Sequence, residues 1–190
     1  SRLIKEYGFI LGIQLMIGLP GDTCELDLYS ARETVTISPS IARLYPTVVI
    51  PDTELHKMFL QGRYCPMQQE DAIIRTAAMY RILDSAGINI IRVGLKSSDI
   101  INGKNMQAGT FHPAFRQLVE GKIAQEDLDI QLRGCKPNTS VCCVSHPDSF
   151  NNMIGHKAVN KKYFSSAYPD LRISYKADGN MRKGTYSIKF

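Results

Sequence analysis

The turn-rich segment Gly18-Leu19-Pro20-Gly21-Asp22-Thr23 is the part of the sequence best suited to binding a ligand. It follows a predicted buried strand and precedes a predicted helix, and ligands of parallel α/β proteins bind at that edge of the sheet. Glycines let the backbone approach a ligand closely, and a helix N-terminus favours anions. A tight turn without a ligand needs the same residue types, so this segment alone leaves both interpretations open.

A second segment, Arg43-Leu44-Tyr45-Pro46-Thr47-Val48-Val49-Ile50, combines polar and aromatic side chains with a strand-like pattern. A proline removes a backbone donor, so Pro46 is expected at a bulge or a strand end. Arg43, Tyr45 and Thr47 alternate with their neighbours and could project together into a barrel interior. Alternatively, Arg43 is a structural ion-pair partner and Tyr45 fills the core.

These segments belong to a predicted strand–helix–strand unit. Residues 9–19 and 42–50 are apolar, strand-like runs, and the intervening helix is expected from Thr23 to Val35. Short connections between the three elements favour a parallel pair with a right-handed crossover. Beyond this unit the sequence predicts helices over 53–60 and 69–86, a strand over 89–95, a polar loop over 96–109 and a helical stretch from His112 to Leu132 that breaks near Gly121.

The last 50 residues predict a smaller set of elements. Strands are expected over 140–144, 171–176 and 185–190, and helices over 147–153 and 156–167. The turn residues Asp178-Gly179-Asn180 between the last two strands favour a hairpin with a loop longer than two residues.

The order of several blocks resembles radical S-adenosylmethionine (SAM) proteins of the elongator-catalytic-subunit type, over residues 8–120. The blocks are Ile13–Thr23, Arg43–Ile50, Thr53–Leu55, Gly62–Pro66, Ile91–Leu95 and Phe111–Phe115. Gly18–Gly21 also resembles oxygen-independent coproporphyrinogen oxidases, which are radical SAM proteins as well.

The resemblance implies an α/β fold that contains a truncated partial TIM-type barrel. Residues 1–50 would hold its last two βα units, 51–132 an accessory helical segment, and 133–190 a small basic α/β layer. The ends of the two barrel strands would form part of a SAM pocket. The contacts carried over are Gly18, Pro20, Gly21, Asp22, Tyr45, Pro46 and Thr47.

The family's three-cysteine motif for a four-iron four-sulfur cluster has no counterpart in the sequence. Five cysteines are present: Cys24, Cys65, Cys135, Cys142 and Cys143. Their spacing predicts neither a disulfide framework nor a metal site, and small buried side chains are the simplest interpretation. The resemblance then implies a fragment that is inactive alone, with SAM and the cluster bound by the intact protein and no cofactor bound here. No acetyl-CoA loop is found, so acetyltransferase activity is not carried over.

Positive charge is concentrated in the tail. Residues 133–190 carry ten Lys/Arg and three Asp, a balance of +7, whereas the chain as a whole carries +5. The predicted helix that begins at His156 holds Lys157, Lys161 and Lys162, where an RNA backbone could dock. A solvated basic face is the alternative. Arg43 and His112 are further candidates for substrate contact, and His112 can equally serve a helix start.

The leading hypothesis is therefore a fragment of a radical SAM enzyme whose intact form cleaves SAM and abstracts hydrogen from its substrate, which the resemblance suggests is a tRNA wobble uridine. The alternative is an RNA- or protein-binding module with no catalysis of its own. A stand-alone α/β protein would need a closed core, whereas a fragment should leave an open strand edge that permits self-association. The sequence predicts no membrane span and, without a signal peptide, a cytoplasmic location.

Overall fold

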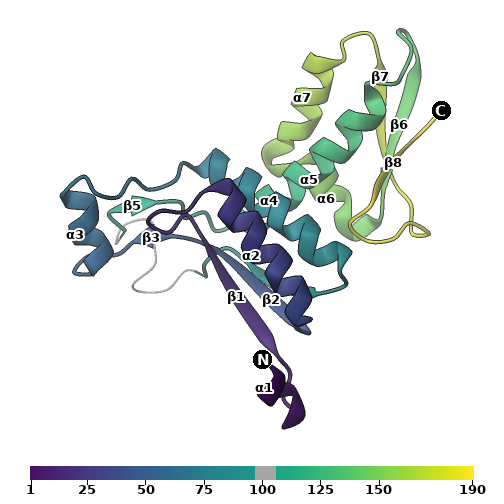
Figure 1. Ribbon diagram of the computed structural model, residues 1–190. Coiled ribbons are helices and arrows are strands. Elements are labelled where there is room, and N and C mark those ends of the chain that lie inside the picture. Colours follow the sequence, from purple (N-terminus) through teal and green to yellow (C-terminus); the bar gives the residue numbers. More distant parts are fainter. Residues whose placement is uncertain (97–105) are drawn as a thin grey trace. The chain divides into compact units, whose positions relative to one another are not determined.

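The computed structural model describes residues 1–96 and 106–190, which form two compact units, Ser1–Arg116 and Gln117–Phe190 (Figure 1). Most of the predicted loop 96–109 lies outside the described residues. The division between the units falls inside the predicted segment 51–132, and the family boundaries after residues 50 and 132 stay predictions. Both units combine helices with sheets, which confirms the α/β class.

The first unit is built on three parallel strands. β1 (Gly12–Ile17), β2 (Ile41–Pro46) and β4 (Asn89–Val93) lie in the order β1-β2-β4. The predicted strand–helix–strand unit is thus confirmed. The predicted strand 42–50 is divided after Pro46, the last residue of β2, and β3 (Val48–Val49) turns away to pair antiparallel with β5 (Ala108–Gly109). Proline offers no N–H for the ladder, so it suits a strand end.

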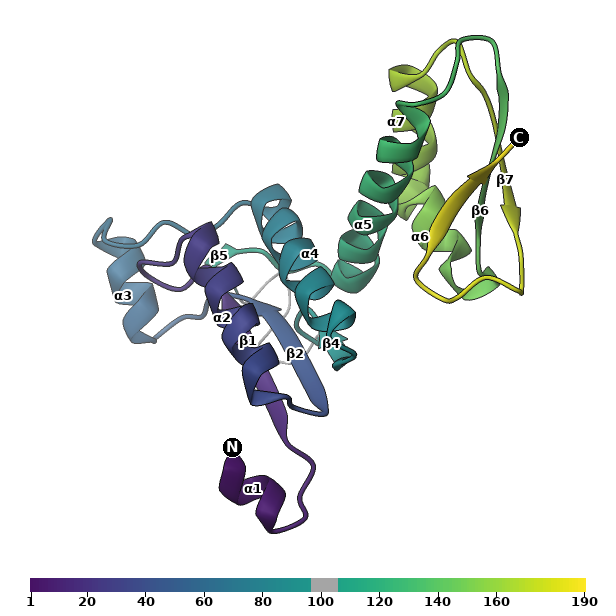
Figure 2. The same cartoon turned by 45° about the vertical axis from the view of Figure 1, so that its right-hand side comes forward.

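Helices α2 (Cys24–Ile37) and α4 (Gln69–Ser85) cover one face of this sheet (Figures 1 and 2). α2 begins as predicted, since the Thr23 hydroxyl accepts a hydrogen bond from the Leu26 N–H at 3.3 Å. α1 (Arg2–Glu6) precedes β1, and α3 (Glu54–Leu60) lies between β3 and α4. The core between helices and sheet contains the fully buried Ile17, Ala31, Leu44, Met79 and Leu83.

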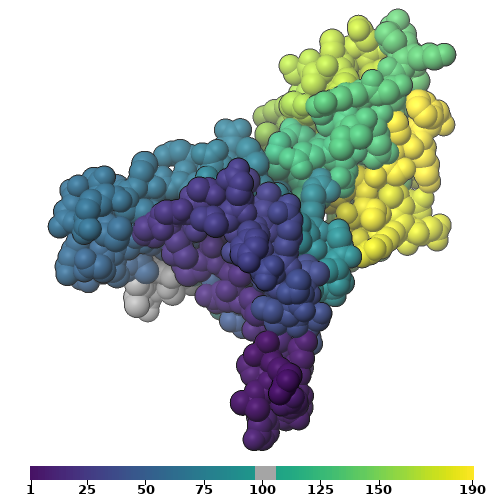
Figure 3. Space-filling view, viewed as in Figure 1, coloured from purple at the N-terminus to yellow at the C-terminus, as the bar shows by residue number. Residues whose placement is uncertain are grey.

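The opposite face of the three-stranded sheet is open and carries three long polar side chains. In the strand register Gln14 lies opposite Arg43, and Arg43 lies opposite Arg92. The three side chains therefore project to the same side of the sheet, where all three are exposed. Within the described ranges β1 pairs only with β2, which leaves its other edge free as expected for a fragment. The segment before β1 protrudes from this unit (Figure 3), joined to the end of α2 by a hydrogen bond from Lys5 Nζ to the Ile37 carbonyl at 2.7 Å, and it exposes 69% of Phe9 and 75% of Ile10.

The second unit places helices against one face of a mixed sheet (Figure 2). α5 (Phe115–Leu132) leads into β6 (Ser140–Ser145), and a 3-10 turn (Pro147–Ser149) precedes α6 (Phe150–Ile154). A second 3-10 turn (His156–Ala158) leads to α7 (Val159–Ala167), followed by β7 (Arg172–Ala177) and β8 (Tyr186–Lys189).

The predicted hairpin between the last two strands is wrong. β6 lies in the centre of the sheet, parallel to β7 and antiparallel to β8, in the order β7-β6-β8. The central position suits the most apolar strand, because Val141, Cys143 and Val144 are all buried there. The two flanking strands therefore meet β6 rather than each other.

The predicted helix break near Gly121 is also wrong, since α5 runs without interruption through that residue. A Cβ added at Gly121 would lie 3.6 Å from the Asn152 carbonyl oxygen and 3.8 Å from the Gly155 Cα, so the glycine serves close packing. The predicted helix 156–167 in fact begins at Val159, because Lys157 (φ 52°) and Ala158 (φ 60°) are left-handed.

Candidate functional site

The loop after β1 is a closed turn at the carboxyl edge of the parallel sheet. Gly18 and Gly21 have φ values of 83° and 85°, which glycine adopts without strain. The Asp22 carboxylate accepts a hydrogen bond from the Leu19 N–H at 2.7 Å, and the Asp22 N–H donates to the Leu19 carbonyl at 3.0 Å. The turn residues predicted to approach a ligand are therefore held by bonds within the turn itself.

A segment between α3 and α4 packs over this turn. The Tyr64 hydroxyl donates to the Gly18 carbonyl at 2.6 Å. A Cβ at Gly18 would lie 3.0 Å from the Met67 methyl carbon, so the missing side chain admits Met67. Burial and the nearby Asp22 carboxylate raise the pKa of Tyr64, which keeps its hydroxyl protonated as a donor.

A cavity of about 360 Å³ lies between the turn and this segment. Small-molecule sites begin at roughly 300 Å³, so the space suits part of a ligand. Four of the predicted cofactor contacts line it: Gly18, Pro20, Gly21 and Asp22. The segment 63–68 and two α4 side chains, Asp71 and Arg75, complete the wall; sequence reasoning missed them, although 62–66 belongs to a block of the resemblance.

Electrostatics at the α4 side of the cavity depend on an ion pair. The Arg75 guanidinium donates to the Asp27 carboxylate at 3.2 Å, and Asp27 is only 3% exposed. Burial raises the pKa of Asp27 despite the opposing effect of Arg75. Arg75 thus joins α4 to α2 while its own side chain reaches the cavity.

The other three predicted cofactor contacts, Tyr45, Pro46 and Thr47, are buried at the end of β2 and do not line this cavity. The Thr47 N–H donates to the Ile17 carbonyl at 2.9 Å, which places it beside the end of β1. The Thr47 hydroxyl is buried and has no hydrogen-bond partner among the described residues. Such an unpaired hydroxyl is uncommon, because most buried polar side-chain atoms have a hydrogen-bond partner.

The described residues do not fit an iron–sulfur cluster. No group of three His, Cys, Asp or Glu side chains that could hold a metal ion occurs among them. All five cysteines are free thiols, and burial raises the pKa of Cys143 to about 12, which disfavours the thiolate that metals need.

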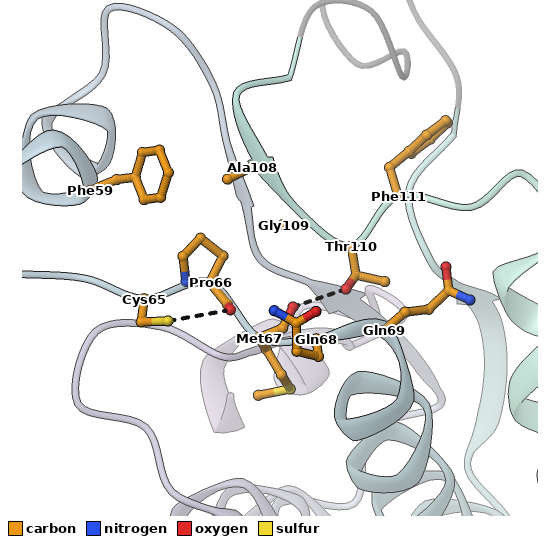
Figure 4. A pocket seen from close by; sticks show the side chains of 10 residues that line it. All are labelled: Phe59, Cys65, Pro66, Met67, Gln68, Gln69, Ala108, Gly109, Thr110 and Phe111. Carbon is orange, nitrogen blue, oxygen red and sulfur yellow. Dashed lines mark hydrogen bonds between the residues drawn. The ribbon is translucent and has the colours of Figure 1, made fainter. Parts of the chain in front are cut away.

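A second cavity, of about 410 Å³, shares the segment 65–68 with the first as part of its lining (Figure 4). Phe59 and Phe111 lie at its rim, and the Thr110 hydroxyl donates to the Met67 carbonyl at 3.1 Å. Cys65 lines both cavities and is exposed. Cys65, Pro66 and Phe111 belong to blocks of the resemblance, but the sequence predicted no cavity among them.

None of the predicted substrate contacts lines either cavity. Arg43 is exposed on the open face of the sheet. The His112 ring accepts a hydrogen bond from the Ala114 N–H at 3.0 Å, the helix-start role weighed above. In the second unit His156 contacts Gln117 at 3.2 Å, and Lys157, Lys161 and Lys162 are exposed.

Part of the chain is similar to a known protein family. Residues 39–125 match the family model described as the Radical_SAM C-terminal domain. Over 76 residues the chain is 34% identical to the tRNA uridine(34) acetyltransferases of Methanocaldococcus infernus and Methanocaldococcus jannaschii, which covers 38% of this chain and 14% of each relative. Over 67 residues it is 39% identical to that of Dehalococcoides mccartyi, covering 34% of this chain and 15% of the relative.

A solved structure shares the fold. The archaeal Methanocaldococcus infernus Elp3 with an N-terminal deletion superimposes with a TM-score of 0.56 and 23% identity, over 66% of this chain and 29% of that one. Residues 39–125 are therefore similar to the C-terminal domain of radical SAM proteins. The chain resembles the C-terminal portion of an elongator-like radical SAM protein. It spans about one seventh of its curated relatives' length, 14% in the first of them, and no described helix meets the length and hydropathy needed to cross a membrane.

Proposed function

We propose that this chain is the C-terminal part of a cytoplasmic radical SAM enzyme that modifies tRNA, and that it is inactive without the rest of the barrel. The observation that carries the proposal is the parallel sheet with one helix-covered face, one open face and a free edge at β1. Part of a TIM-type barrel would have this combination, since the strands of that barrel are covered by helices outside and project side chains inside.

In this proposal the free edge of β1 pairs with a preceding barrel strand. Gln14, Arg43 and Arg92 would then face the barrel interior, where Arg43 can contact an anionic substrate. Residues 1–50 supply the last two predicted barrel units, and 51–132 supply the accessory segment, whose strand β4 extends the same sheet.

The chain's share of the SAM site is the turn after β1 and the end of β2. The Gly18–Asp22 turn forms the wall, and the Thr47 hydroxyl is the unpaired polar group available to the ligand. SAM bound at a four-iron four-sulfur cluster supplies the radical that abstracts hydrogen. The cluster's ligands must come from outside the described residues.

The test compares the chain alone with the longer product of its gene under anaerobic, reducing conditions. We expect 5′-deoxyadenosine only from the longer product, and a loss of more than tenfold in SAM affinity for its Thr47→Val variant, because a buried hydrogen-bond partner is removed. Thr36→Val, at an exposed turn of α2, is the matched control. A gene that encodes no three-cysteine motif ahead of residue 1 would refute the proposal.

The alternative function is a binding module without catalysis. It is favoured by the separate compactness of Gln117–Phe190, whose exposed Lys157, Lys161 and Lys162 lie outside the residues matched by the family model. RNA binding by this chain, together with no SAM cleavage by any longer product of its gene, would support this alternative.

A further inference from the structure

The connection between α6 and α7 is a short loop with an uncommon backbone. Gly155-His156-Lys157-Ala158 joins the two helices, and three of its four residues have positive φ: 80° at Gly155, 52° at Lys157 and 60° at Ala158. The Gly155 conformation is tightly enclosed, since an added Cβ would lie 2.9 Å from the Asn160 and Val159 atoms. Only glycine can occupy that position without displacing its neighbours.

A buried asparagine holds this loop in place. Asn160 is 2% exposed, and its side-chain amide donates to the carbonyls of Gly121 at 2.8 Å and Asn152 at 3.1 Å. The same side chain therefore ties α7 to α5 and to α6. These hydrogen bonds fix the position of the loop relative to the helices.

The loop and the first turn of α7 carry positive charge that no acidic group offsets. Lys157, Lys161 and Lys162 are exposed, and none has an ion-pair partner in the parts of the chain that the structure describes. By contrast, Lys183 pairs with Asp148 at 3.4 Å and Lys189 with Asp178 at 2.9 Å. Val159, which is 52% exposed, adds an apolar surface between the lysines.

This combination matches a known way of holding single strands. KH modules clamp four nucleotides by their backbone with a G-x-x-G loop. Here a G-x-x-A loop joins two helices packed on a three-stranded sheet. Along the chain, β6 precedes the helix pair and β7 follows it, and these two strands pair in parallel. Ala158 stands at the fourth position of the motif, and it adopts the left-handed conformation that a glycine there would favour.

We propose that Gln117–Phe190 is a KH-like module whose 155–158 loop binds the phosphate backbone of single-stranded RNA. Lys157 contacts a phosphate from the loop, and Lys161 and Lys162 extend the contact along α7. The choice of RNA over DNA rests on the proposed function; the choice of a single strand rests on the loop.

The test is fluorescence anisotropy of the full chain with a labelled oligoribonucleotide of about ten nucleotides, long enough to fill a four-nucleotide clamp. We expect Lys157→Glu to weaken binding about tenfold at low salt and to reduce the salt slope by about one, as loss of one phosphate contact does. Lys161→Glu, on the exposed face of α7, is a second variant that leaves the loop unaltered.

Lys136→Glu is the matched control. It makes the same charge change on an exposed lysine of the α5–β6 connection, at the other end of this unit from the α6–α7 loop (Figure 2). We expect less than about a twofold effect from it, as for a charge that touches no phosphate. Circular dichroism melts of each variant establish that the fold is retained.

Equal losses from Lys136→Glu and from both test variants would show attraction by net charge alone and overturn the clamp. Binding of a duplex as tightly as of the single strand would overturn it too. Tighter binding of a single-stranded DNA of the same sequence would overturn the assignment to RNA. No readout involves SAM, so failure here leaves the radical SAM proposal standing.

Discussion

Two buried aspartates show how the number of donors sets the charge state of a carboxyl group. Asp27 accepts a hydrogen bond from Arg75, and burial raises its pKa. Burial would raise the pKa of Asp129 as well, but hydrogen bonds from Tyr168, Tyr163 and Arg133 outweigh it and lower that pKa. One site therefore tolerates its charge poorly, and the other stabilises it.

The first prediction concerns the pair at the cavity wall. Arg75→Met leaves the Asp27 carboxylate buried without its cation, which should cost about 2–3 kcal/mol of unfolding free energy at pH 7. Because the folded-state pKa of Asp27 is raised, the penalty of its charge falls as pH decreases through that pKa. Urea melts at pH 7 and pH 4 should show a smaller loss at pH 4.

The double variant Asp27→Asn/Arg75→Met provides the control, since it removes the buried charge together with its partner. It should be more stable at pH 7 than Arg75→Met alone. Identical stability of the two variants would contradict an electrostatic origin of the loss.

The second prediction concerns Asp129. Tyr168→Phe removes a donor 2.7 Å from its carboxylate and should cost about 1–3 kcal/mol at pH 7. The lowered pKa means that the stability from Asp129 is present above its unfolded value of about 3.9 and is lost as pH falls through the folded value. The difference between variant and wild type should shrink in acid. Tyr29→Phe, in an exposed position, should change neither the unfolding free energy nor its dependence on pH.

At the scale of elements, the starts of α2 and α3 followed local sequence signals, whereas helix continuity did not. Thr23 caps α2 as predicted, and Thr53 caps α3; each hydroxyl accepts a hydrogen bond from the backbone N–H three residues on. Gly121 resembled a helix break but lies inside α5, where its small size admits the Asn152 carbonyl and the Gly155 backbone.

The third prediction tests that packing. The nearest atom to a Cβ at Gly121 would be 3.6 Å away, an ordinary contact, so Gly121→Ala should fit. It should raise the unfolding free energy by about 0.5–1 kcal/mol, because alanine favours the helix. Gly121→Leu should lower it by about 1–3 kcal/mol, since the side chain has no space. Thermal melts that rank leucine above alanine would refute this account.

At the scale of the whole molecule, each unit has a three-stranded sheet whose outer strands are paired on one side only within the described residues. The outer strand β1 differs from the others in the residues that precede it. Unpaired edges and exposed apolar side chains favour association. Leu3, Tyr7, Phe9 and Ile10 lie exposed directly before that edge.

The fourth prediction follows from this edge. We expect the chain to self-associate as its concentration rises, and Phe9→Lys/Ile10→Lys to shift it towards the monomer by removing apolar surface and adding like charges. Sedimentation velocity over a range of concentrations measures the change. Lys substitution of the exposed Leu60 and Ile130, which lie far from β1 in the sequence, should leave association unaltered.

The predictions for strands show how far local pattern reaches. The parallel pair β1–β2 was predictable because a short strand–helix–strand sequence permits little else. The partners of β7 and β8 were not, because turn residues between two strands are compatible with a hairpin or with a third strand between them. The apolar β6 takes the central place because it buries the most surface there.

For the candidate site, too, some features follow from local sequence and others from contacts between distant segments. The sequence by itself determined the glycine turn after β1, the proline that ends β2, the basic tail and the family resemblance, since each depends on residue type and short spacing. Only the tertiary structure decided that Tyr64 and Met67 cover the turn, that the Thr47 hydroxyl is left unpaired, and that Lys157 projects from a left-handed loop. Those features depend on contacts such as Asn160 with Gly121, 39 residues apart, and a burial-driven contact between distant segments has no local signature.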